Sequence, residues 1–214
     1  MSKIVGHLTP AIDCALCPRL KSYLDKHRQL FPDWHNAPVA PFGGTDAWLL
    51  VVGLAPGLRG ANCTGRPFTG DGAGDLLYPT LIINGLASGN YARHPKDGIK
   101  LNGVRITNAV RCVPPGNKPT TAEINTCRPF LVDEIRALKS LRVILALGKI
   151  AHDAVLTATG LRKAAHKFSH NSHHPLPNSL ILVDSYHCSR YNVNTRRLTP
   201  KMFTEVFETV KRLR

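Results

Sequence analysis

Residues 48–57 read WLLVVGLAPG, a continuous apolar run that ends in glycine and proline. A run without alternation is typical of a strand that is buried on both faces of a parallel sheet. A second buried strand is predicted at 142–147 (RVILAL) and a last strand at 179–186 (SLILVDSY). The segment 104–110 (VRITNAV) is also predicted as a strand, because it alternates and is β-branched. Because helical patterns separate these strands, the sequence predicts an α/β fold, with three α/β/α layers around a mostly parallel, four-stranded sheet.

Helices are predicted at 18–31, 74–86, 120–138 and 149–159, and a last one begins at Pro200. Thr120 or Thr121 can cap the third of them, and with Thr120 as the cap Glu123 falls at the capping-box position. A chain of 214 residues with 43% hydrophobic content can fill one large core. We therefore expect a single domain over 1–214, with the N-terminal segment (about 1–45) as an appendage.

The chain is strongly basic, with 28 Lys and Arg against 14 Asp and Glu and a formal net charge of +14. Excess charge can simply keep a protein in solution. Here it is spread along the chain, which favours a polyanionic partner such as nucleic acid. The sequence shows neither a signal peptide nor a run of about 18 apolar residues. It therefore predicts a cytosolic protein with no membrane partner.

Unusual polar segments follow three of the predicted strands, at the sheet edge where α/β proteins bind ligands. The first, 53–71, is rich in glycine but lacks the GK[ST] and GxGxxG patterns of nucleotide-binding loops. The second contains Asn108, whose amide can read a pyrimidine edge or tie down a turn. The third begins at His187, which can donate a hydrogen bond to an anionic leaving group, and continues into arginines that can hold phosphates. The convergence of all three favours a functional site.

Six cysteines in a reducing compartment indicate metal ligation or packing rather than disulfides. Cys14 and Cys17 form a CxxC pair, and Cys112 and Cys127 flank a proline-rich loop. Four thiolates suit either zinc or an iron–sulfur cluster. The histidine-rich stretch at 166–174 is spaced irregularly, and we interpret it as a solvated or DNA-facing loop rather than as a metal site.

In their order and spacing, the segments at 53–56, 60–75, 107–118 and 187–199 resemble the uracil-DNA glycosylase superfamily, above all its family 5 (type B) and next its family 4. The resemblance runs from the CxxC pair to Thr199. It implies a monofunctional glycosylase of base excision repair that hydrolyses the N-glycosidic bond of uracil, hypoxanthine, xanthine or ethenocytosine in DNA. It also implies a monomer.

The resemblance assigns a structural [4Fe-4S] cluster to Cys14, Cys17, Cys112 and Cys127, which would tie on the N-terminal segment. Cys63 and Cys188 are left over, and we expect them to be packing residues.

The resemblance also implies roles for the three segments. The flipped base would stack on Phe68, and Asn108 would read its edge. The backbone of Gly53, Leu54 and Ala55 would line the other side. His187 would stabilise the departing anion. The predicted DNA-contact residues are Arg190, Asn192, Arg196 and Arg197.

Water activation is expected of Asp75, with Asp71 as the second choice, although either aspartate can instead cap the helix that follows. Three other functions are considered. A family 4 enzyme specific for uracil usually has Glu at the position of Leu54. A non-catalytic iron–sulfur DNA-binding protein would not need Phe68, Asn108 and His187 together. A zinc deaminase needs an HxE motif, and this sequence has none.

Overall fold

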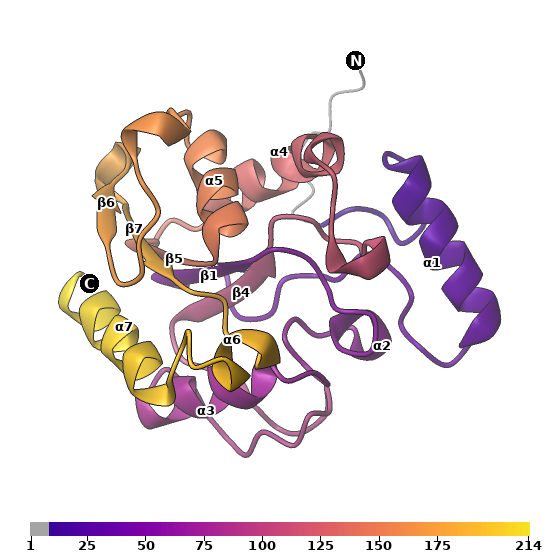
Figure 1. Ribbon diagram of the computed structural model, residues 1–214, viewed down its shortest axis with the longest axis horizontal. Coiled ribbons are helices and arrows are strands. Elements are labelled where there is room, and N and C mark those ends of the chain that lie inside the picture. The colour runs from indigo at the N-terminus through magenta and orange to yellow at the C-terminus, as the bar shows by residue number, and fades with distance from the viewer. Residues whose placement is uncertain (1–8) are drawn as a thin grey trace.

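The computed structural model of the protein describes residues 9–214, so the first eight residues of the predicted N-terminal appendage lie outside it (Figure 1). Four parallel strands form the centre of the sheet: β1 (Leu49–Gly53), β4 (Val104–Asn108), β5 (Val143–Leu147) and β7 (Ile181–Ser185). The strand order is β4-β1-β5-β7-β6. The predicted α/β class is therefore confirmed.

The sheet has five strands rather than the predicted four. The additional strand, β6 (His173–Pro175), pairs antiparallel with β7 at the edge of the sheet. It lies within the histidine-rich stretch that we interpreted as a loop. Three residues ending in proline are too short to show a strand periodicity, so the sequence pattern could not reveal it.

Helices cover both faces of the sheet (Figure 1). One face carries α4 (Thr121–Ala137) and α5 (Lys149–Ala158), and the other carries α3 (Gly74–Ile83) and α7 (Pro200–Arg212). Successive residues of a strand point to opposite faces. In β1, Leu50 and Val52 pack with the α4 and α5 side chains, whereas Leu49 and Val51 pack on the α3 and α7 side. Burial on both faces explains why this strand reads as an uninterrupted apolar run.

The capping box of α4 is confirmed. The Thr120 hydroxyl accepts a hydrogen bond from the Glu123 amide at 3.2 Å, and the Glu123 carboxylate accepts one from the Thr120 amide at 2.7 Å. Glu123 also binds the Arg19 guanidinium of α1 (Pro18–Leu30), with an Nε–Oε1 distance of 2.7 Å. Glu123, the second residue of the capping box, thus links α1 to α4.

The remaining elements are short. They are α2 (Ala61–Thr64), α6 (Arg190–Asn194), the paired strands β2 (Ala87–Ser88) and β3 (Lys100–Leu101), and the 3-10 turns Pro115–Asn117, Lys163–Ala165 and Pro177–Ser179. Within residues 9–214, no helix combines the length and the apolar character that crossing a membrane requires.

Candidate active site

A cavity of about 410 Å³ opens at the carboxyl ends of β1, β4 and β7. Residues of all three sequence segments line it together, as the sheet-edge argument predicted. The lining residues are Leu54, Ala55, Pro56, Gly57, Ala61, Phe68, Asp71, Gly72, Ala73, Asn108, Asn117, His187, Ser189, Arg190 and Tyr191.

Gly53, the last residue of β1, allows two lining residues of the cavity to approach its backbone closely. A Cβ atom at Gly53 would collide with Asn108 Oδ1 and with the ring of Phe68. Gly53 pairs with Asn108 in the β1–β4 register, and its carbonyl accepts a hydrogen bond from the Ala109 amide at 2.9 Å. Of the three backbone positions predicted to line the site, Leu54 and Ala55 line the cavity, whereas Gly53 lies next to the lining residues Asn108 and Phe68.

Phe68 is held in an unusual backbone conformation. Its φ angle of 53° lies in the left-handed region, which disfavours residues that have a side chain. Its carbonyl accepts a hydrogen bond from the Tyr91 hydroxyl at 3.2 Å, and its ring centroid lies 6.0 Å from that of His187. Strained backbone of this kind persists where the surrounding structure enforces it, often at a ligand site. The conformation presents the aromatic ring to the cavity.

His187 lies two residues beyond the end of β7 and lines the same cavity. Burial lowers the pKa of its imidazole below the ordinary value, and the negative charge of Asp71 opposes this shift without reversing it. The ring is therefore neutral at pH 7 and carries one N–H that it can donate. The Asn192 side chain donates a hydrogen bond to the His187 carbonyl at 2.8 Å. Asn192, predicted as a DNA contact, thus positions the backbone of the histidine.

The two candidate carboxylates lie in different surroundings. Asp71 lines the cavity, and its Oδ1 accepts hydrogen bonds from the Ala73 and Gly74 amides at 3.1 and 3.4 Å. Asp75, which the sequence analysis favoured, lies in the first turn of α3 and away from the cavity. It pairs with the Arg93 guanidinium, with an Nε–Oδ1 distance of 2.7 Å. The structure therefore brings Asp71, rather than Asp75, to the site.

Three predicted DNA-contact arginines lie in α6 or shortly after it. Arg190, Arg196 and Arg197 are all exposed, and Arg190 lines the cavity. Tyr191 lies between them in sequence with 73% of its surface exposed, and it lines the cavity mouth. Tyr191 and Asn117 were not identified as site residues from the sequence. Tyr191 could have been identified from the sequence, because it is an aromatic residue in an arginine-rich segment. For Asn117, the only indication in the sequence is its position in the second polar segment.

Cys14, Cys17, Cys112 and Cys127 line a second, smaller cavity between α1 and α4. Burial, together with the charges of Cys127, Glu123 and Cys14, raises the pKa of the Cys17 thiol to about 11. A tetrahedral zinc ion with Zn–S bonds of about 2.3 Å would hold sulfurs about 3.8 Å apart. In the described part of the chain, no three of these sulfurs lie mutually within 4.8 Å. The four residues therefore fit a larger group, such as a four-iron cluster, better than a single ion.

The other two cysteines lie outside that cavity. Cys188 is fully buried in the core next to the α7 side chains, as expected of a packing residue. Cys63 is half-buried in α2.

Comparison with known proteins agrees with this geometry. Residues 40–211 match the family model of the uracil DNA glycosylase superfamily. The chain is 47% identical to the type-5 uracil-DNA glycosylase of Thermus thermophilus (94% of this chain, 93% of the relative) and 41% identical to that of Mycobacterium leprae (94% and 91%). Similarity to a type-4 uracil-DNA glycosylase of Pyrobaculum aerophilum is 36% and spans 70% of this chain and 63% of the relative.

The chain therefore belongs to the uracil-DNA glycosylase superfamily. Its similarity to the type-5 members covers more of the chain than the type-4 match does, which confirms the family 5 resemblance.

Proposed function

We propose that the protein is a DNA glycosylase that hydrolyses the N-glycosidic bond of uracil, and also of hypoxanthine, xanthine and ethenocytosine, in base excision repair. The observation that carries the proposal is the meeting of Phe68, Asn108 and His187 in one cavity at the sheet edge. Each comes from a different segment of one chain. We also propose that the enzyme acts as a monomer and that the described residues, 9–214, form one domain.

The geometry supports a mechanism in which the target base leaves the helix stack. Its ring would stack on Phe68, and the Asn108 amide would pair with its polar edge. As the C1′–N bond breaks, negative charge develops on the base, and the N–H of neutral His187 stabilises it. A water molecule attacks C1′ and transfers its proton to Asp71. The products are the free base and an abasic site.

The proposed broad base range rests on the two residues that follow β1 in the cavity lining. Leu54 and Ala55 are both apolar, so no charged or hydrogen-bonding side chain at these positions selects against a purine. A site rejects an analogue strongly when a buried polar group would be left unpaired. An apolar wall lacks this discrimination, which is consistent with tolerance of hypoxanthine.

The test is base release from labelled duplexes that carry uracil, hypoxanthine or ethenocytosine, followed by alkaline cleavage of the abasic sites. We expect the wild-type protein to release several of these bases. Asn108→Ala should reduce the rate by about 10²-fold or more, because the base edge loses its partner. Asn102→Ala, an exposed asparagine outside the cavity, should retain the wild-type rate.

Two other outcomes would change the assignment. Release of uracil alone would indicate a specificity like that of family 4. Release of no base, with tight DNA binding retained, would identify a non-catalytic DNA-binding protein.

We also propose that Cys14, Cys17, Cys112 and Cys127 hold a [4Fe-4S] cluster with a structural role. Such a cluster would tie the loop before α1 to the segment after β4 and to α4. Support comes from the position of these cysteines around one cavity and from their packing against Leu20 and Phe130. The reaction described above uses none of them.

Replacement of one cluster ligand should therefore affect folding more than chemistry. Cys127→Ser is expected to lose iron and about 3 kcal/mol of stability, which corresponds to a fall in Tm of roughly 6–12 °C. Iron analysis and thermal unfolding measure both effects. Cys63→Ser, in a half-buried cysteine outside the cavity, should keep its iron and its Tm. Equal iron content in the two variants would contradict the assignment.

A further inference from the structure

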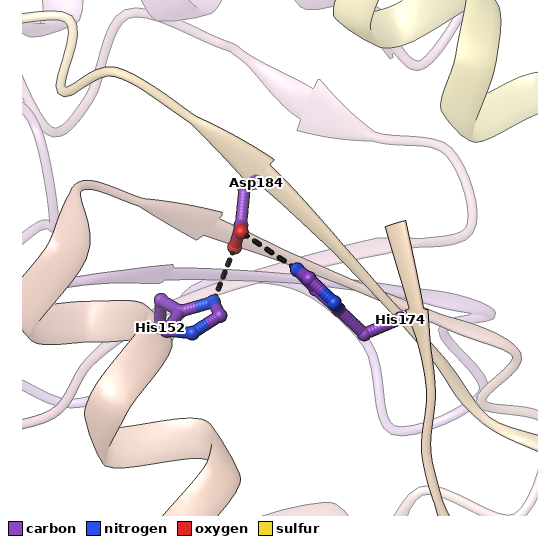
Figure 2. Close-up of side chains that lie close together, drawn as sticks. All are labelled: His152, His174 and Asp184. Atoms are coloured by element: carbon purple, nitrogen blue, oxygen red, sulfur yellow. Dashed lines mark hydrogen bonds and ion pairs between the residues drawn. The ribbon is translucent and has the colours of Figure 1, made fainter. Parts of the chain in front are cut away.

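A second cluster of polar side chains lies between α5, β6 and β7, apart from the cavity described above (Figure 2). Asp184 of β7 is fully buried and lies between two histidines. His152 Nδ1 of α5 lies 2.7 Å from Asp184 Oδ1, and His174 Nε2 of β6 lies 3.0 Å from Asp184 Oδ2. These ligand atoms all lie within 4.8 Å of one another.

The Asp184 carboxylate needs a compensating positive charge because it is removed from water. In the described part of the chain, its ion-pair partners are the two histidines, and no Lys or Arg pairs with it. Two neutral histidines would leave the buried negative charge uncompensated. The cluster therefore requires a cation, either an added proton or a metal ion.

The hydrogen bonds of His152 show where such a cation can lie. Its Nε2 donates to the His166 carbonyl at 2.9 Å, so in the neutral ring Nδ1 carries a lone pair. That lone pair faces the Asp184 carboxylate oxygen, which is also an acceptor. Metal-binding histidines are commonly oriented by a carbonyl that accepts the N–H of the other ring nitrogen. His152 has this arrangement.

A fourth polar group faces the same space. Ser172 Oγ lies 3.3 Å from Asp184 Oδ2 and 3.4 Å from His174 Nε2. Its hydroxyl proton has a closer acceptor in the Ser169 carbonyl, at 2.6 Å, which leaves its lone pairs available. The His174 side chain is 13% exposed, whereas those of His152 and Asp184 are fully buried. Solvent, and an ion, can therefore reach the cluster from the β6 side.

We propose that His152, His174 and Asp184 form a binding site for a divalent transition-metal ion such as Zn²⁺. Two imidazole nitrogens and one carboxylate are a common protein ligand set for first-row divalent metals, with a solvent or hydroxyl oxygen completing the shell. The ion would fasten the short edge strand β6 to β7 and α5. The site was not apparent from the histidine-rich stretch because two of its three ligands lie elsewhere in the sequence.

Zinc binding to the full chain, purified with its iron and dialysed against a chelator, tests this proposal. Titration calorimetry with Zn²⁺ should give one site per chain. His174→Gln should weaken that site by more than the ~10–100-fold that is lost when a residue hydrogen-bonded to a metal ligand is replaced. His173→Gln is the matched control, because His173 is the exposed neighbour on the same strand and should bind as the wild type does.

Metal analysis and spectroscopy separate this site from the cysteines. Iron content should be equal in all three proteins, and Co²⁺ bound in place of Zn²⁺ should show no thiolate charge-transfer absorption. Zinc should also raise the Tm of the wild type, a readout that does not depend on how well His174→Gln folds. Zinc binding that is equal in wild type and His174→Gln, a thiolate band, or an unchanged wild-type Tm would each overturn the proposal.

Discussion

Asp71→Asn is expected to lower kcat for uracil release by about 10²–10⁴-fold, the range typical of a lost general base. The Asp71 carboxylate is the one that lines the cavity, and its charge acts on His187. Its Oδ1 is engaged by the amides that begin α3, and a Cβ atom at Gly57 would lie 2.9 Å from its Oδ2. Glycine at position 57 thus leaves room for the second carboxylate oxygen, the one proposed to accept a proton from water. Single-turnover rates of uracil release measure the effect.

The matched control is Asp75→Asn, four residues further along. Asp75 is engaged by exposed Arg93, and a surface ion pair contributes about 0–1 kcal/mol to stability. We expect its single-turnover rate to stay within a few-fold of wild type. An asparagine oxygen can accept the same hydrogen bonds from the Ala73 and Gly74 amides, so Asp71→Asn should keep the turn before α3 and the folded state. If Asp75→Asn were the inactive variant and Asp71→Asn the active one, the water-activating role would belong to Asp75.

The elements that the sequence predicted well are those whose burial decides their pattern. β1 and β5 are buried on both faces and read as apolar runs, and the helices between the strands cover those faces. The carboxyl ends of parallel strands then meet at one edge. Asn108 and His187 follow this rule directly, because each lies at or just beyond the end of a strand.

The details that the sequence could not give depend on the path of irregular backbone. Asp71 and Asp75 belong to the same motif, and only the loop conformation before α3 places one on the cavity and the other beside Arg93. The β6 strand and the pairing of His174 with Asp184 could not be predicted either. Both depend on long-range contacts, which leave no periodicity in the local sequence.

His187→Ala is expected to lower kcat by about 10²–10³-fold, the cost of removing one preorganised hydrogen-bond donor from a developing anion. DNA binding and Tm should change little, because the lost N–H acts on charge that is present only in the transition state. His187→Gln should recover part of the rate, since its amide can also donate one hydrogen bond while remaining neutral. Single-turnover kinetics on a uracil duplex compare the three proteins.

The pH profile distinguishes a neutral donor from a cationic one. Because burial holds the pKa of His187 below its ordinary value of 6.5, the ring stays neutral above that pH and for some distance below it.

If the neutral N–H stabilises the anion, the rate of base release by the wild type should not rise as the pH falls from 8 to 6.5. His187→Gln should show the same pH profile at a lower rate. A wild-type rate that climbs about tenfold for each pH unit lost, with no such climb in His187→Gln, would mean that the imidazolium form is the active one. A neutral histidine is the form that the structure supports: protonation would place a cation at a buried position, where the Asp71 charge does not fully offset the lost solvation.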